Sequence, residues 1–238
     1  MLREFVGRQL DHDPNFRWRG ESVTRIENLS DIAFALSLGM LISGANAPSN
    51  FSELRAFLFY LLPAAASFGV ILKIWTAHFT FFRRYGVADR TIIFLNSLLI
   101  FVVLYLAYPL RFTFDALYAW IIGEITQNYS RAIEIGMNDA NAALTISFFV
   151  GGYGICMALL ALKYEHVVRR KSTLELDDYE LAKTRATRAE LWLGAVLAFP
   201  AISLALFTTA GPMAAFLLTL QFPGRHLLTR HYLGKLDG

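Results

Sequence analysis

The stretch TIIFLNSLLIFVVLYLAYPL, residues 91–110, contains no Asp, Glu, Lys or Arg. A helix needs about 20 predominantly apolar residues to cross the hydrocarbon core of a bilayer, so this run is long enough to span it. Four further long runs without these residues occur in the chain, at residues 32–52, 56–72, 140–162 and 191–224. The pattern predicts an all-α, polytopic membrane protein.

The composition excludes other classes of protein. Of the 238 residues, 55% are hydrophobic and 17% are charged, and the mean hydropathy is +0.44. Soluble domains usually carry about a quarter charged residues, so a water-soluble globule is disfavoured. The formal net charge is +3, but the basic residues lie between the apolar runs and form no stripe, so we expect no nucleic-acid partner. A single cysteine, Cys156, excludes an intramolecular disulfide framework and a multi-cysteine metal site.

The last apolar run would be about 50 Å long as one helix, which exceeds the roughly 30 Å core of a bilayer. Gly211-Pro212 offers a break inside it, so we predict six transmembrane helices. The expected spans are about residues 29–47, 54–78, 91–109, 140–163, 190–207 and 209–226. They form a transmembrane domain of residues 25–227, between an N-terminal segment of residues 1–24 and a tail of residues 228–238.

Loop charges give the orientation. Lys and Arg residues are concentrated before the first span, in the second connection and in the fourth, where Lys163 is counted as the first of them. Basic loops remain on the cytoplasmic side, so both termini are predicted to be cytoplasmic. Residues 114–138 have helical spacing of apolar side chains and suggest an interfacial helix on the outer side, and residues 172–188 suggest a solvated cytoplasmic helix or linker.

Polar residues at the edges of the spans share one depth. Arg25, Ser30, Asp31, His78 and Asn96 all lie toward the predicted cytoplasmic ends. Buried polar groups in a membrane are costly unless they pair, so these residues can form one network. The alternative is that Arg25, Asp31 and His78 reach separately into the lipid headgroups. The spacing does not decide between the two.

Several motifs carry a family resemblance. Residues 25–31, Arg-Ile-Glu-Asn-Leu-Ser-Asp, resemble the Arg-x-x-x-Phe-Ser-Asp signature that opens the first helix of the transmembrane protein 175 family of potassium channels, with Leu29 in place of the Phe. Trp75-x-x-His78 and Asn96 resemble motifs of that family's second and third helices. The resemblance covers roughly residues 25–163.

The resemblance implies a bacterial potassium channel with one six-helix unit per subunit, assembled as a homotetramer in the inner membrane. Its first helices would line the pathway of the permeant potassium ion, without a cofactor, and the apolar constriction would be Leu36. Trp75 would join the polar network. Helical geometry places Leu36, Met40 and Ser43 on one face of the first helix. That face suits a hydrophobic constriction, although ordinary helix packing would produce the same pattern.

Other functions receive less support from the residues. Gly151-Gly-Tyr-Gly154 resembles a carbonyl filter but lies inside an apolar run, where a helical backbone would satisfy its own carbonyls. We therefore expect no Gly-Tyr-Gly filter. An enzyme is not expected, because His78 is the only histidine within reach of a span and has neither metal-ligand partners nor a nucleophile. The alternative function is a non-conducting or differently coupled membrane protein, such as a small transporter or an assembly partner.

Overall fold

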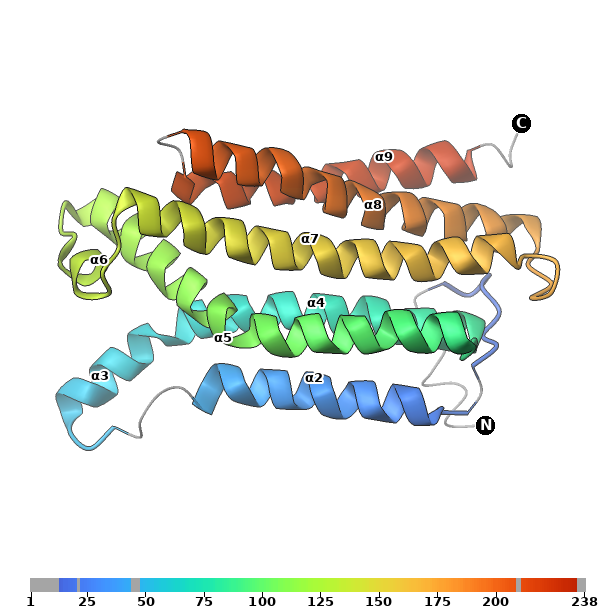
Figure 1. Cartoon of the computed structure of the whole chain (residues 1–238), viewed down its shortest axis with the longest axis horizontal. Helices are drawn as coiled ribbons and strands as arrows, with labels where there is room; N and C mark the ends of the chain where they lie inside the picture. Colours follow the sequence, from blue (N-terminus) through green and yellow to red (C-terminus); the bar gives the residue numbers. More distant parts are fainter. Residues whose placement is uncertain (1–12, 21, 44–47, 209–210, 235–238) are drawn as a thin grey trace.

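The protein is an elongated bundle of helices that lie side by side (Figure 1). The structure, a computed structural model, describes residues 13–20, 22–43, 48–208 and 211–234, and no β-strand occurs among them, so the all-α class is confirmed. In chain order the elements are α2 (Arg25–Ser43), α3 (Phe51–Phe59), α4 (Leu61–Tyr85), α5 (Arg90–Thr126), α6 (Ser130–Glu134), α7 (Asp139–Arg169), α8 (Asp178–Phe207), the 3-10 helix η1 (Gly211–Leu220) and α9 (Gln221–Leu233).

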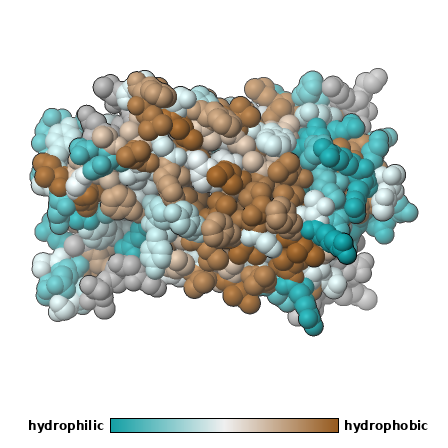
Figure 2. Space-filling view, viewed as in Figure 1, coloured by the Kyte–Doolittle hydropathy of each residue, from teal (hydrophilic) through white to brown (hydrophobic). Residues whose placement is uncertain are grey.

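The helices have the length and composition of membrane spans. Four segments of the described chain are long and apolar enough to cross a bilayer: residues 51–85, which comprise α3 and α4, then α5, residues 140–169 of α7, and α8. Figure 2 shows hydrophobic side chains gathered over the middle of the molecule and hydrophilic ones toward its two ends. α2 begins and α9 ends at the same end of the bundle (Figure 1). The protein is therefore a multi-pass membrane protein.

α7 is the central helix, because it packs against α4, α5, α8 and η1. Its glycines permit two of these close approaches. A Cβ atom at Gly152 would lie 2.7 Å from Leu106 of α5, and one at Gly154 would lie 2.7 Å from the Cβ atom of Ala198 on α8. Small residues drive helix association in membranes by letting backbones approach closely, which explains this part of the sequence. Cys156 on the same helix is fully buried.

α5 differs from its predicted span. The helix passes through Pro109 and continues to Thr126, so the expected separate interfacial helix of residues 114–138 is wrong in its first half. Apolar spacing alone did not show that one helix covers both segments. Proline removes one backbone hydrogen bond and bends a helix, and α5 changes direction along its length (Figure 1). Neighbouring helices and local hydroxyls make this tolerable, and here Thr113 donates a hydrogen bond of 2.8 Å to the Pro109 carbonyl.

Two helices extend beyond their predicted boundaries at the basic end of the bundle. α4 continues past His78 to Tyr85, where Gly86 ends it in the left-handed conformation, with φ at 61°. α8 begins at Asp178, and a reciprocal capping box between Asp177 and Glu180 fixes its first turn. Of the two expectations for residues 172–188, a solvated helix or a linker, the helix is found from Asp178 on. It is not fully solvated, because Glu180 and Thr184 are buried.

The glycine contacts of α7 lead to a stability prediction. Gly154→Ala places a methyl group against Ala198 and should destabilise the protein by about 1 to 3 kcal/mol through overpacking. Gly151→Ala is the matched control, because its new Cβ would meet Ile202 at an ordinary 3.7 Å. Thermal unfolding in detergent measures both variants. Equal midpoints for the two would show that the α7–α8 approach does not require a glycine.

Candidate functional site

α2 has one buried and one exposed face. Ser30, Ala33, Phe34, Ser37 and Leu41 are buried against the bundle, and α2 packs on α4 and α5. The opposite face is apolar and exposed in the single chain; it carries Leu29, Ile32 and Leu36, and 57% of the Leu36 surface is accessible. Met40 is half-buried at the edge of this face, and Ser43 is the last residue of α2, with its side chain outside the described set. The exposed face is therefore free to meet a pathway or another subunit.

A chain of buried hydrogen bonds fixes the inner face of α2. The Ser30 hydroxyl donates to the Ile26 carbonyl at 2.7 Å and accepts from the Asn96 amide nitrogen at 2.7 Å. The Asn96 amide oxygen in turn accepts from Lys163 Nζ at 3.1 Å. Ser30, Asn96 and Lys163 all have 0% exposure, so the chain links α2, α5 and α7 without contact with water. We call these three residues the Ser30–Asn96–Lys163 chain.

Of the three residues in the Ser30–Asn96–Lys163 chain, Lys163 is the one whose position the sequence analysis predicted wrongly. The prediction counts it among the cytoplasmic loop residues, whereas the structure buries it completely inside α7. Its ammonium group lies 4.5 Å and 4.4 Å from the ring centroids of Phe81 and Phe82, which provide cation–π stabilisation. A signal for this burial exists in the sequence, because Tyr164 and Val167 continue the apolar helical spacing past the lysine.

The other predicted network residues do not all join the chain. Trp75 Nε1 donates to Asp31 Oδ1 at 2.9 Å, and this pair lies at an exposed edge of the α2–α4 contact. Arg25 is exposed, and within the described residues no hydrogen bond or ion pair connects it to Asp31. His78 is only 2% exposed and lies between the rings of Phe34 and Phe82, and neither ring nitrogen has a hydrogen-bond partner among the described residues. The expected layer is therefore separated into a buried hydrogen-bond chain, an exposed pair, a buried His78 packed against aromatic rings, and an exposed Arg25.

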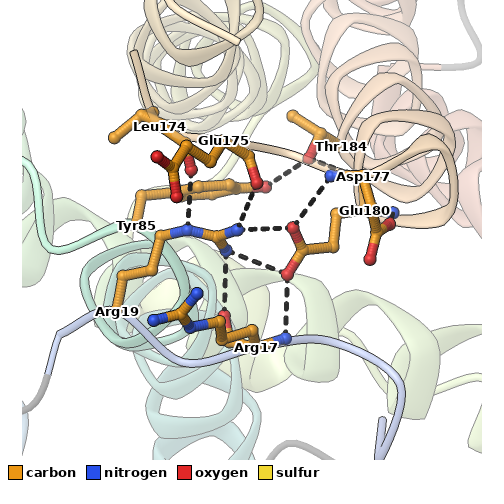
Figure 3. Close-up of polar contacts among 8 residues, drawn as sticks. All are labelled: Arg17, Arg19, Tyr85, Leu174, Glu175, Asp177, Glu180 and Thr184. Carbon is orange, nitrogen blue, oxygen red and sulfur yellow. Dashed lines mark hydrogen bonds and ion pairs between the residues drawn. The ribbon is translucent and has the colours of Figure 1, made fainter. Parts of the chain in front are cut away.

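A second cluster of charges, which the sequence does not reveal, closes the basic end of the bundle (Figure 3). The Arg19 guanidinium binds both carboxylate oxygens of Glu180, and it also donates to the carbonyls of Leu174 and Glu175 at 2.9 and 3.0 Å. The backbone N–H of Arg17 adds a bond of 2.9 Å to Glu180, whose side chain is 2% exposed. The segment before α2 is thereby attached to the start of α8.

Neighbouring contacts reinforce this attachment. Arg84 near the end of α4 and Lys183 on α8 both form ion pairs with Asp13, at 3.7 and 3.5 Å. Tyr85 and Thr184 share a buried hydrogen bond of 2.8 Å. The N-terminal segment, α4 and α8 are therefore joined by polar contacts at one end, while apolar packing joins the helices elsewhere. Among the described residues, no group of three or more His, Cys, Asp or Glu side chains could hold a metal ion.

The Arg19–Glu180 pair gives a second stability prediction. Arg19→Met leaves Glu180 as a buried, unpaired carboxylate and should destabilise the protein by about 3 to 5 kcal/mol. Arg169→Met, which removes a pair whose arginine is 75% exposed, should change stability by about 1 kcal/mol or less. Thermal unfolding in detergent measures the difference. Similar losses of stability in both variants would show that the buried ion pair contributes no more than the exposed one.

Comparison with known proteins finds a matching family model and a similar protein. Residues 25–106, which contain α2, α3, α4 and the first part of α5, match the family model described as endosomal/lysosomal potassium channel TMEM175. A protein of Marivirga tractuosa named potassium channel is 34% identical over 178 residues, which are 74% of this chain and 71% of that protein.

Two solved structures show the same architecture. The crystal structure of a variant of the potassium channel MtTMEM175, in complex with a nanobody–MBP fusion protein, has a TM-score of 0.80 and 28% identity, and the match covers 91% of this chain and 96% of that one. A lysosomal potassium-selective channel TMEM175 homologue from Chamaesiphon minutus matches in fold, with a TM-score of 0.50, 18% identity, and coverage of 90% and 97%. The resemblance read from the sequence is confirmed: the chain belongs to the TMEM175 family of potassium channels.

Proposed function

We propose that the protein is a potassium-selective ion channel that assembles as a homotetramer in a bacterial inner membrane. The observation that carries the proposal is the exposed apolar face of α2, which includes Leu36 and lies opposite a face anchored by the Ser30–Asn96–Lys163 chain. In the proposed orientation the spans are α2, α3 with α4, α5, α7, α8, and η1 with α9. Both termini then lie in the cytoplasm, at the end of the bundle where the ion pairs of Arg19 and Arg84 are found.

The pathway follows from the orientation of α2. One subunit presents one such helix, so several copies are needed to enclose a pathway around an axis. A ring of Leu36 side chains would form its narrowest point, with Met40 and Ser43 on the following turns. An apolar ring offers no ligands to an ion, so the barrier depends on how much of the hydration shell the ion must lose. Potassium, which passes without a cofactor, is the permeant ion of this proposal.

We further propose that no Gly-Tyr-Gly filter operates. Residues 151–154 lie within α7, where helical hydrogen bonds occupy the backbone carbonyls. The Tyr153 side chain is 4% exposed, and its hydroxyl donates to Gln221 Oε1 at 2.9 Å. These features support a packing role for the motif. The family assignment and the four long apolar helices support conduction over an enzymatic function.

Assembly is the first test of the proposal. Native mass spectrometry of the purified protein in detergent should give the mass of four chains, because the exposed faces of α2 and α5 carry large apolar side chains that a subunit interface can cover. A monomer at every protein concentration would contradict the channel and favour the non-conducting alternative.

The constriction gives the second test. Leu36→Ala should raise potassium flux and reduce the preference for potassium over sodium, because a shorter side chain widens the ring. Leu36→Asn should wet the ring and reduce the preference in a similar way. Bi-ionic reversal potentials in planar bilayers measure both.

Tyr153→Phe is the control for the constriction, because it changes only the hydroxyl of the glycine motif and should keep the parent selectivity. Parent selectivity in both Leu36 variants would remove this residue from the pathway. A loss of selectivity in Tyr153→Phe alone would favour a filter at residues 151–154.

A further inference from the structure

A cavity of about 340 Å³ lies between α4, α5, α7 and η1, apart from the exposed face of α2. Most of its wall is apolar or aromatic, including Phe114, Phe149, Phe216 and Phe222. One side is formed by the 3-10 helix η1, which is narrower than an α-helix and therefore fills less of the space beside α7. Phe216 and Phe222 are 48% and 62% exposed, so the cavity opens to the surface of the subunit.

A single cation stands at one end of this cavity. Lys73 lies at the midpoint of α4, and its Nζ donates to Tyr153 Oη at 2.7 Å and to Gln221 Oε1 at 3.2 Å. Both acceptors are neutral, and no carboxylate lies within ion-pair distance of Lys73 among the described residues. Glu190 is the acidic group that interacts with Lys73 at longer range, but it forms its ion pair with Arg225, at 3.5 Å. The ammonium charge therefore lacks a direct counter-ion.

Next to Lys73, the side-chain amide of Gln221 has a donor without a hydrogen-bond partner among the described residues. Its amide oxygen accepts from both Lys73 and Tyr153, which fixes the orientation of the amide. The amide nitrogen is buried and has no hydrogen-bond partner among the described residues. A buried donor without a partner is costly, and so is an intramembrane cation without an anion. Both residues line the same cavity, but only Lys73 is exposed, since the Gln221 amide nitrogen is itself buried.

We propose that this cavity binds a single-chain amphiphile with a carboxylate head. The carboxylate would supply the missing anion for Lys73, whose side chain is exposed, and the apolar chain would lie along the aromatic wall toward Phe114. The cavity volume is at the lower end of the range for small-molecule sites, so one short chain fits and a two-chain phospholipid does not.

Decanoate labelled with ¹³C at its carboxyl carbon is the probe, added to the intact protein in nanodiscs and compared with empty nanodiscs. We expect a bound carboxyl resonance whose titration midpoint lies at lower pH than in empty nanodiscs, because the Lys73 ammonium group favours the ionised form. Decanol, which has the chain without the charge, and acetate, which has the charge without the chain, should compete poorly.

Two variants locate the binding. Lys73→Met keeps most of the side-chain volume and should weaken decanoate binding about tenfold or more. Gly69→Leu should abolish binding by filling the cavity; a Cβ atom at Gly69 has no atom within 4 Å, so the fold can accept the larger side chain. Lys171→Met and Gly151→Ala are the matched controls. Lys171 is an exposed lysine, and neither residue lines the cavity, so both variants should bind decanoate like the parent.

The outcomes separate the alternatives. Equal binding of decanol and decanoate, unchanged by Lys73→Met, would show that the cavity takes up any apolar chain, such as a lipid tail, and would overturn the proposal. Decanoate that remains bound in Gly69→Leu would place the site elsewhere and would also overturn it. The measurement reads binding alone, so its result is independent of whether the protein conducts potassium.

Discussion

The buried ammonium group of Lys163 constrains the arrangement of the helices around it. A buried amine in a membrane interior is expensive, so it must find hydrogen-bond acceptors and groups that favour its charge, and the buried carboxyl of Glu27 interacts with it at longer range. The Asn96 amide oxygen and the faces of Phe81 and Phe82 meet this need, and they belong to α5 and α4. With its oxygen engaged by the lysine, the Asn96 amide offers its nitrogen to Ser30 of α2. Four helices are thus fixed relative to one group.

The rotation of α2 follows from this chain. With Ser30 turned toward Asn96, the helical repeat turns Leu36 to the opposite side, where 57% of its surface is exposed. In the proposed tetramer that side lines the ion pathway. A polar contact on the inner face would therefore set the position of an apolar residue on the outer face, although the two side chains do not touch. The side chains that line the proposed pathway would therefore be determined by contacts outside it.

The two intramembrane lysines are accommodated differently. Lys163 is fully buried, bonded to Asn96, and covered by two rings. Lys73 is exposed and hydrogen-bonded to the neutral groups of Tyr153 and Gln221 at the end of an apolar cavity, and its ammonium group lies farther from its two nearest rings, 5.4 and 5.3 Å from the centroids of Tyr153 and Phe222. The first arrangement is closed and suits a structural role. The second leaves the lysine exposed and without a carboxylate partner among the described residues, which is the basis for proposing a ligand there.

The sequence by itself determined the class of fold, because uncharged runs of about 20 residues leave a backbone in lipid no stable alternative to helices. The motifs at residues 25–31, at Trp75 and His78, and at Asn96 together indicated the family, and helical spacing alone put Leu36, Met40 and Ser43 on one face. Tertiary structure decided which polar groups meet. Lys163 and Glu180 look like loop charges in the sequence, yet both are buried because Asn96 and Arg19, distant along the chain, pair with them. Spacing within one helix defines its faces, but the neighbour that each face meets depends on how all the helices pack, and so does the choice between a buried charge and a solvated one.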